Sequence, residues 1–75
     1  MISYKNDYEE YNGEGRKYED ALIKSGKGVC KYYSGDIYTG FFKNNLKNGQ
    51  GEMQYSTNDI VVGRWINDRL NGPGV

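Results

Sequence analysis

Three Gly-x-Gly triplets recur at a fixed interval along this chain of 75 residues. They occupy residues 26–28, 49–51 and 72–74, so each triplet begins 23 residues after the one before it. Other positions repeat at the same offset, namely Tyr32 and Tyr55, Asp36 and Asp59, Ile37 and Ile60, Gly40 and Gly63, Phe42 and Trp65, and Asn48 and Asn71. Agreement at this many positions indicates an internal repeat, and periods of about 20–50 residues are typical of stacked repeat architectures.

Residues alternate along each unit in the way that predicts β-strands. Residues 36–43 show this period of two, and so does their copy at residues 59–66. One face carries the same kinds of residue in both copies: Tyr38, Gly40 and Phe42, then Val61, Gly63 and Trp65. The glycine leaves a notch, and we expect an aromatic ring from the neighbouring hairpin to lie against its bare backbone.

The links between these strands contain turn-forming residues. Residues 34–36 and 57–59 place a glycine or an asparagine where a tight hairpin turn needs a positive φ. Residues 44–48 and 67–71 are expected to form longer polar loops that lead into the Gly-x-Gly triplets. The sequence therefore predicts an all-β fold, an open-ended antiparallel meander of β-hairpins that extends by stacking.

The front of the chain is a weaker copy of the repeat. Tyr11 and Gly13 match the start of a unit, but Gly15 stands at the aromatic position. Four extra residues fall within residues 16–25, where they could lengthen the hairpin or form a helical turn. We expect residues 11–75 to form the repeat array and residues 1–10, which are polar, to be a loosely ordered extension.

The last unit stops at Val75, just after Gly74, whereas the two earlier units continue through a second strand. This difference predicts either that the chain is a fragment or that another chain supplies the missing strand by edge pairing.

The residue types exclude several kinds of catalytic and metal site. The chain has no histidine, so it has no Ser-His or Cys-His pair and no imidazole ligand. The Gly-x-Gly triplets do not continue into either common phosphate-binding pattern. Asp36, Asp59 and Asp68 lie too far apart for an EF-hand loop and recur as turn residues. We therefore expect no catalytic residue, no metal and no cofactor, and hence no enzymatic activity.

Composition also narrows the compartment and the partners. Cys30 is the only cysteine, and we expect it to be a partly buried small hydrophobe in a reducing compartment. Neither a signal peptide nor a stretch of ~20 apolar residues is present, which predicts an intracellular, cytoplasmic chain that does not cross a membrane. The ten acidic residues balance the ten basic ones, which argues against nucleic acid as a partner and favours self-association.

Two sets of side chains are candidates for partner binding. The aromatic set consists of Tyr32, Tyr38, Phe42, Tyr55 and Trp65. Its members either stack as a core between repeats or line an exposed groove for a peptide or helix, where tyrosine and tryptophan are typical hot-spot residues. The basic set consists of Lys43, Lys47, Arg64 and Arg69. Its members either keep the protein soluble or dock weakly on an acidic partner or a lipid headgroup.

The order Tyr-x-Gly-x-(Trp/Phe), followed by Asn-Gly-x-Gly, in a 23-residue period resembles the MORN repeat. Residues 38–51 fit best, and residues 61–74 fit with Val61 in place of the first tyrosine. The unit that begins at Tyr11 fits poorly. The chain is thus similar to a MORN-repeat protein with two good repeats, residues 36–75, and one degenerate repeat, residues 11–35.

This resemblance implies a single-layered or gently grooved β-meander that is not itself a catalyst. It implies a protein-interaction scaffold or binding segment of the kind found in ciliary and cytoskeletal assemblies, with a protein or a second copy as partner. Two alternatives remain open, a peripheral phospholipid-binding module and an accessory segment of a larger enzyme. No functional residue carries over from the family, because the matching positions are structural.

Overall fold

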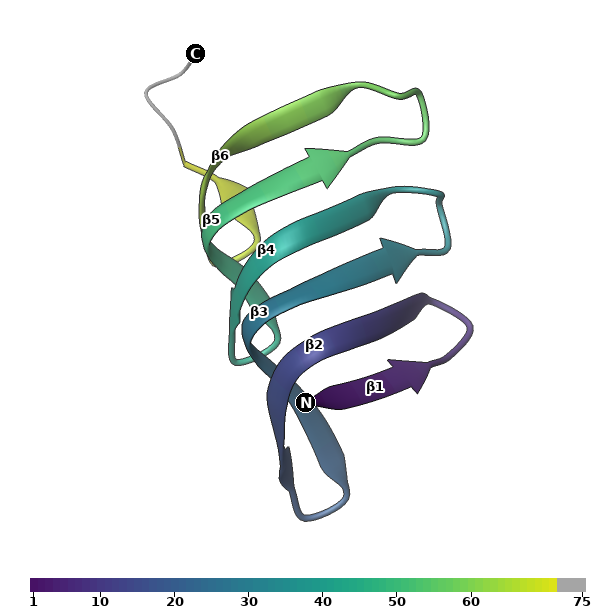
Figure 1. Ribbon diagram of the computed structural model, residues 1–75, viewed down its shortest axis with the longest axis vertical. Helices are drawn as coiled ribbons and strands as arrows, with labels where there is room; N and C mark the ends of the chain where they lie inside the picture. The colour runs from purple at the N-terminus through teal and green to yellow at the C-terminus, as the bar shows by residue number, and fades with distance from the viewer. Residues whose placement is uncertain (72–75) are drawn as a thin grey trace.

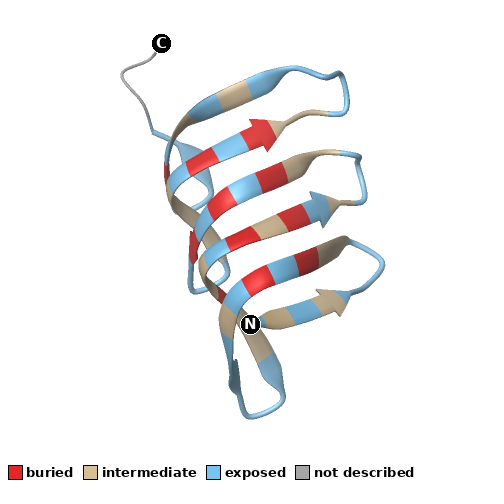
Figure 2. Cartoon of the chain, in the orientation of Figure 1, coloured by how far each residue is buried: buried red, intermediate tan, exposed pale blue. Residues whose placement is uncertain are grey.

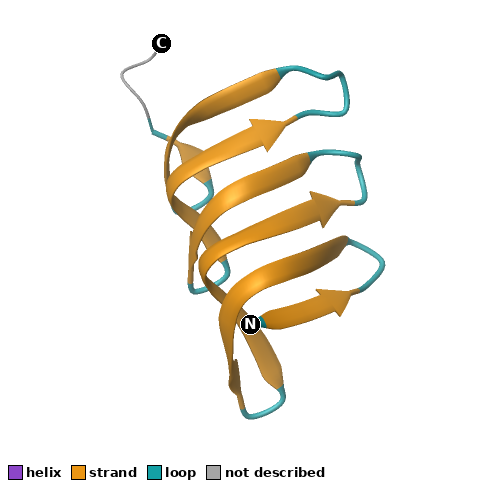
Figure 3. Cartoon of the chain, viewed as in Figure 1, coloured by secondary structure: helices purple, strands orange, loops and turns teal. Residues whose placement is uncertain are grey.

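The computed structural model describes residues 1–71, which form seven strands in a single sheet. Each strand pairs in antiparallel fashion with the next one along the chain (Figure 1, Figure 3). The strands are β1 (Ile2–Lys5), β2 (Glu9–Tyr18), β3 (Ala21–Tyr32), β4 (Ile37–Lys43), β5 (Leu46–Gln54), β6 (Ile60–Ile66) and β7 (Arg69–Leu70). The predicted all-β meander of hairpins is confirmed, and the four extra residues of the first unit lengthen the β2–β3 hairpin.

A row of five glycines crosses the sheet from β2 to β6. In the strand register, each of the following lies opposite the next: Gly13, Gly28, Gly40, Gly51 and Gly63. The adjacent row on the same face is Tyr11, Cys30, Tyr38, Met53 and Val61. In the β2–β3 hairpin Tyr11 therefore lies opposite Cys30, and in the β4–β5 hairpin Tyr38 lies opposite Met53.

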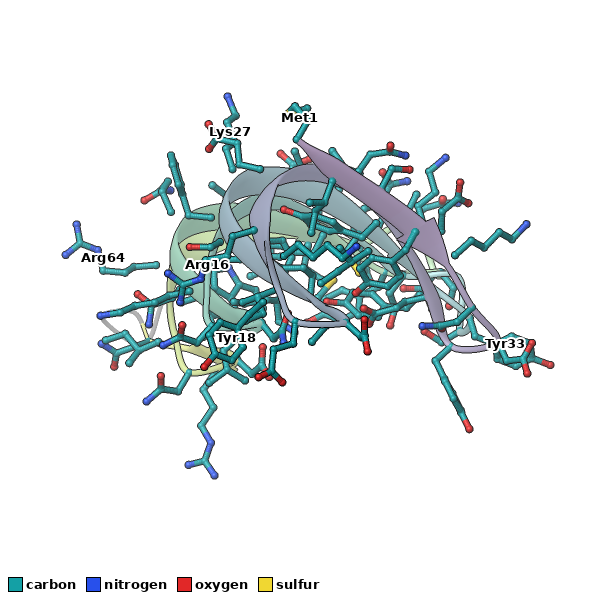
Figure 4. The ribbon with its side chains drawn as sticks, turned by 90° about the horizontal axis from the view of Figure 1, so that it is seen from below. Met1, Arg16, Tyr18, Lys27, Tyr33 and Arg64 are labelled. Atoms are coloured by element: carbon teal, nitrogen blue, oxygen red, sulfur yellow. The ribbon has the colours of Figure 1, made fainter. Side chains whose placement is uncertain are left out.

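The hairpins bend sharply at this glycine row. In the β4–β5 hairpin the register shifts between Gly40 and Phe42, and Gly49 has a φ of 109°, which a residue with a Cβ rarely adopts. The β2–β3 hairpin has the same shift and the same kind of backbone at Gly26, whose φ is 104°. Because both bends lie along the same row of glycines, the sheet curves into an arch whose interior is filled by side chains (Figure 4).

Each bend is closed by a tyrosine of the repeat. The hydroxyl of Tyr38 donates to the carbonyl of Phe41 at 3.0 Å, and a Cβ at Gly51 would overlap that hydroxyl. Tyr11 makes the equivalent bond to the carbonyl of Glu14 at 2.7 Å. The expected ring on a bare glycine is thus present, but it comes from the paired strand of the same hairpin rather than from the neighbouring hairpin.

The core is a continuous stack of aromatic rings on the inner face of the arch. Successive centroids lie 5.9 Å apart for Tyr4 and Tyr11, 5.3 Å for Tyr11 and Phe42, 5.0 Å for Phe42 and Tyr38, and 5.5 Å for Tyr38 and Trp65. The last three contacts are edge-to-face, the geometry that aromatic pairs prefer. Figure 2 shows the alternation of buried and exposed positions that this one-sided core produces.

The turns correct one prediction from the sequence. Only two residues, Asn44 and Asn45, join β4 to β5, with φ values of 51° and 71°. This is the left-handed pair that a two-residue type I′ turn requires. The 33–36 and 55–59 links are longer, with Gly35 and Asn58 in the left-handed region. The tight turn and the longer loop were therefore assigned to the wrong links, because asparagine and glycine mark both kinds.

Successive hairpins are joined by a repeated pair of hydrogen bonds. The amide of Lys24 donates to the side chain of Asn45 at 2.7 Å, and the amide of Asn45 donates back to the carbonyl of Lys24 at 3.0 Å. Lys47 and Asp68 make the same two bonds at the same distances, 23 residues further on. The turn residue of one hairpin thus fixes the position of the hairpin before it.

Residues 1–10, predicted to be an extension, contain the first strand of the sheet. Strand β1 pairs with β2 from Ile2 to Lys5, and Tyr4 packs against the core. The side chain of Ile2 occupies the space above Gly15, which explains why this unit lacks an aromatic residue there. The polar composition of the segment did not indicate a strand, because only alternate residues of β1 face the core.

At the other end of the chain, β7 pairs with the end of β6 at Trp65 and Ile66, and the amide of Asn71 donates to the carbonyl of Arg64 at 2.8 Å. The expectation of a missing pairing strand concerns residues 72–75, which lie outside the described residues.

We predict that Gly51→Ala lowers the free energy of unfolding by about 3 kcal/mol, because the new methyl group overlaps the Tyr38 hydroxyl. The double variant Tyr38→Val/Gly51→Ala should lose less than the sum of its single variants, since valine is the residue at the equivalent position 61. Urea unfolding followed by Trp65 fluorescence measures these values. Thr39→Ala, on the exposed face of β4, is the control, and strict additivity of the two changes would contradict this account.

Candidate binding site in the groove of the arch

Two lysines cover the aromatic stack on the inner face. Lys24 of β3 and Lys47 of β5 stand 23 residues apart at equivalent positions, and each extends its stem across the rings. Lys24 is only 6% exposed. A single-layered sheet leaves one side of its core open, and these long side chains close it while keeping their ammonium groups near the groove.

Lys24 takes part in a polar cluster at the β1–β3 end of the groove. Its Nζ lies 2.7 Å from Oε2 of Glu9, 5.3 Å from the ring centroid of Phe42 and 5.9 Å from that of Tyr11. The same carboxylate oxygen accepts a hydrogen bond from the hydroxyl of Tyr4. Strand β1 supplies Tyr4, β2 supplies Glu9 and β3 supplies Lys24, so the cluster needs all three strands.

Lys47 lies in a cage of three aromatic rings. Its Nζ is 5.3 Å from the centroid of Tyr32, 5.8 Å from that of Tyr38 and 5.6 Å from that of Trp65. Oδ1 of Asp68 lies 3.5 Å away and balances the charge. Burial raises the pKa of Tyr32, and it raises that of Tyr38 to about 12. Both rings therefore stay neutral at physiological pH and offer electron-rich faces to the cation.

This arrangement separates the predicted aromatic set into two groups. Tyr38, Phe42 and Trp65 are buried in the core, whereas Tyr32 and Tyr55 are partly exposed and pack against its edge. Tyr32 and Tyr55 therefore keep part of their surface exposed, although Lys47 lies over the ring of Tyr32 as well. The sequence did not single out Lys24, Glu9 or Tyr4; the shared 23-residue offset of Lys24 and Lys47 is the signal that could have found the first of them.

The predicted basic set does not form one surface. Lys47 faces the groove and is paired with Asp68, whereas Lys43, Arg64 and Arg69 are exposed at positions that alternate with inward-facing residues. Figure 4 shows Arg64 pointing away from the interior of the arch. No common face therefore presents all four charges.

A pocket of about 520 Å³ opens beside the Lys24 cluster. The long β2–β3 hairpin, the β1–β2 turn and the Asn44–Asn45 turn surround it. Its walls are Tyr4, Asn6, Glu9, Asp20, Leu22, Lys24 and Asn45. The extra residues of the first unit thus build one wall of this pocket, which is why the later, shorter hairpins have no equivalent of Asp20 and Leu22.

The titrating groups of this pocket form an ion pair and not an acid–base pair. Burial by itself would raise the pKa of Glu9, but hydrogen bonds from Lys24 and Tyr4 outweigh that effect and lower the pKa below its ordinary value. Burial raises the pKa of the Tyr4 hydroxyl, with the neighbouring Glu9 adding to the effect. Glu9 is therefore a carboxylate and Tyr4 a neutral donor near neutral pH, a set suited to binding polar groups.

Cys30 lies behind this cluster and is fully buried, and burial raises the pKa of its thiol. Within residues 1–71, no group of three or more potential metal-ligating side chains lies together. No helix among these residues is long and apolar enough to cross a membrane.

The MORN repeat family model matches three consecutive segments, residues 23–37, 38–60 and 62–75. These segments cover more than half of the chain, so the protein belongs to the MORN repeat family. A comparison with curated protein sequences finds no significant match. The second matched segment spans 23 residues, the interval at which the bends, the lysines over the core and the inter-hairpin hydrogen bonds also repeat.

We predict that Glu9→Gln lowers the free energy of unfolding by about 2–3 kcal/mol at pH 7, because it leaves the Lys24 ammonium buried beside a neutral amide. The double variant Glu9→Gln/Lys24→Met should recover most of this loss. Lys31→Met, which removes an exposed lysine of the same strand, is the matched control. Equal losses in the single and double variants would contradict a functioning buried pair.

The same pair predicts the direction of a pH dependence. The pKa of Glu9 is lower in the fold than its ordinary value of 4.5, so its stabilisation is complete above that value and is lost as the pH falls through the lower, folded one. Wild-type stability should therefore decrease on acidification below about pH 5 more steeply than that of Glu9→Gln.

Proposed function

We propose that this chain is a non-catalytic protein-interaction segment, an arched MORN scaffold whose groove binds a partner. The finer proposal is that it serves an intracellular assembly of the ciliary or cytoskeletal kind in which MORN arrays occur. The observation that supports binding most directly is the pocket beside Lys24, where charged and aromatic side chains from three strands converge. A concave pocket with a few converging polar groups is the usual form of a recognition site.

The charges of the pocket indicate what it binds. Lys24 and Glu9 neutralise each other, and Asp20 makes no ion pair within residues 1–71. One negative charge is therefore left without a counterion. Tyr4 and Leu22 supply apolar walls beside it. A lysine or arginine side chain fits both features, since its stem packs on apolar groups while its head reaches a carboxylate.

The partly exposed rings of Tyr32 and Tyr55 would extend this contact along the groove. Tyrosine contributes strongly at interfaces because it carries a large apolar ring and a hydroxyl with few rotatable bonds. The partner that this proposal requires is a peptide segment with a basic residue next to apolar ones.

We predict that N-acetyl-arginine amide shifts the backbone NMR signals of residues around the pocket, with Tyr4 and Asn45 as reporters, whereas N-acetyl-glutamate amide does not. Asp20→Asn should weaken this response several-fold, because it removes the unpaired carboxylate. Glu10→Gln, which changes a carboxylate of β2 that does not line the pocket, is the control. Equal shifts with both probes, or no effect of Asp20→Asn, would refute the assignment.

The alternative proposal, a phospholipid-binding module, receives less support. A membrane surface attracts several basic residues on one face, each worth about 1 kcal/mol near an anionic bilayer. Here Lys47 is paired inside the groove, and the chain has a formal net charge of zero.

We therefore predict no sedimentation of the chain with vesicles of phosphatidylcholine containing phosphatidylserine or phosphoinositides at physiological salt. Binding that persists at that salt and is lost in Arg64→Ala/Arg69→Ala would favour the lipid function instead. The matched control is Lys5→Ala/Lys31→Ala, which removes two exposed charges at the other end of the sheet.

A further inference from the structure

The outer face of the arch changes character along the sheet. Over β1–β3 it carries opposite charges in register: Lys5 lies opposite Glu10, and Glu10 lies opposite Lys31. Over β4–β6 the corresponding positions are Ile37, Gln54 and Ile60. The N-terminal half therefore presents opposite charges on neighbouring strands, and the C-terminal half exposes apolar side chains.

Four of these side chains form what we call the outer patch: Phe41, Ile60, Val62 and Ile66, which are 43%, 56%, 62% and 42% exposed. Phe41 and Val62 both line a shallow hollow of about 350 Å³ above Gly40 and Gly51. Phe41 and Val62 therefore share one surface, and Ile60 and Ile66 lie on the same outward side of β6 as Val62. Contiguous exposed apolar surface of this kind is typical of protein contacts.

Charged groups of both signs lie at the hollow. Glu52 and Lys27 line it, and Arg64 lies opposite Gln50, which also lines it. None of the three makes an ion pair within residues 1–71. Figure 4 places Lys27 and Arg64 on the outside of the arch, directed away from its interior. An acid and two bases beside an apolar patch are complementary to a second copy of the same surface.

We propose that the outer patch is a self-association surface through which two copies of this chain pack back to back. A two-fold axis brings the same patch of both copies together, so each surface must be complementary to itself. Phe41 and Val62 form the centre of the contact, and Glu52 of each copy faces Arg64 of the other. The zero net charge of the chain imposes no long-range repulsion between copies.

This assembly leaves the groove free, because the groove opens on the opposite face of the sheet. A back-to-back pair would hold two grooves facing outward in opposite directions. The proposal thus goes beyond binding by one chain, since a paired scaffold can hold two partner segments at once and gain avidity from doing so.

Sedimentation equilibrium of the full chain between about 10 µM and about 1 mM tests the pairing, a range that covers weak to moderate affinities. The wild type should change from monomer to dimer across it. Val62→Lys should raise the dissociation constant at least tenfold, while Tyr33→Lys, which adds the same charge at an exposed turn, should leave it unchanged. Circular dichroism of each variant verifies that the sheet is intact.

A charge exchange distinguishes specific pairing of these surfaces from nonspecific association. Glu52→Arg and Arg64→Glu should each be monomeric, because like charges then face each other across the two-fold axis. An equimolar mixture of the two variants should dimerise again, since every facing pair is opposite once more. A monomeric wild type up to about 1 mM, or a mixture that stays monomeric, would overturn the proposal; groove binding by the arginine probe would be unaffected by either result.

Discussion

The fold depends on one contact, a tyrosine ring lying against a bare glycine at the bend of its own hairpin. Tyr38 fills the space in which Gly51 has no side chain, and its hydroxyl satisfies the carbonyl of Phe41 where the strand register breaks. A bend without that donor would leave a partly buried carbonyl unpaired, at a cost of at most about 1–3 kcal/mol. Repetition of the contact at Tyr11 and Gly28 places both bends on one line, and this alignment turns a flat meander into an arch.

Once the sheet is arched, its inner face must be covered without a second layer. Lys24 and Lys47 do this, and each brings a carboxylate with it, Glu9 or Asp68. The charged groups of the groove are therefore a consequence of closing the core. The same requirement places these charged groups on the inner face, while apolar side chains of β4–β6 such as Phe41 and Val62 stay exposed on the outer face of the described sheet.

Sequence reasoning predicted the repeat, the strands and the space that a mid-strand glycine leaves for an aromatic ring, because these are local or periodic properties. It misassigned the turns, since Asn44–Asn45 and Asn58 carry the same residue type in turns of different length. It treated residues 1–10 as an extension, because only the pairing of β1 with β2 shows that Ile2 fills the space above Gly15. It also grouped Lys47 with Arg64, although Lys47 lies over the inward-facing rings of Tyr38 and Trp65 and Arg64 points away from the interior of the arch.

By itself, the sequence determined that this protein is a stack of 23-residue hairpins of the MORN family, because spacing and residue type suffice to specify a repeated unit. Only the tertiary structure decided which aromatic residues are core and which are accessible, and which charges are free. Those properties depend on where the sheet bends and on which side chain from another hairpin covers a given ring. The pairing of Glu9 with Lys24, 15 residues apart, follows from the arch. Strand alternation places Phe41 and Phe42 on opposite faces, and the arch decides that the face of Phe42 is the enclosed one.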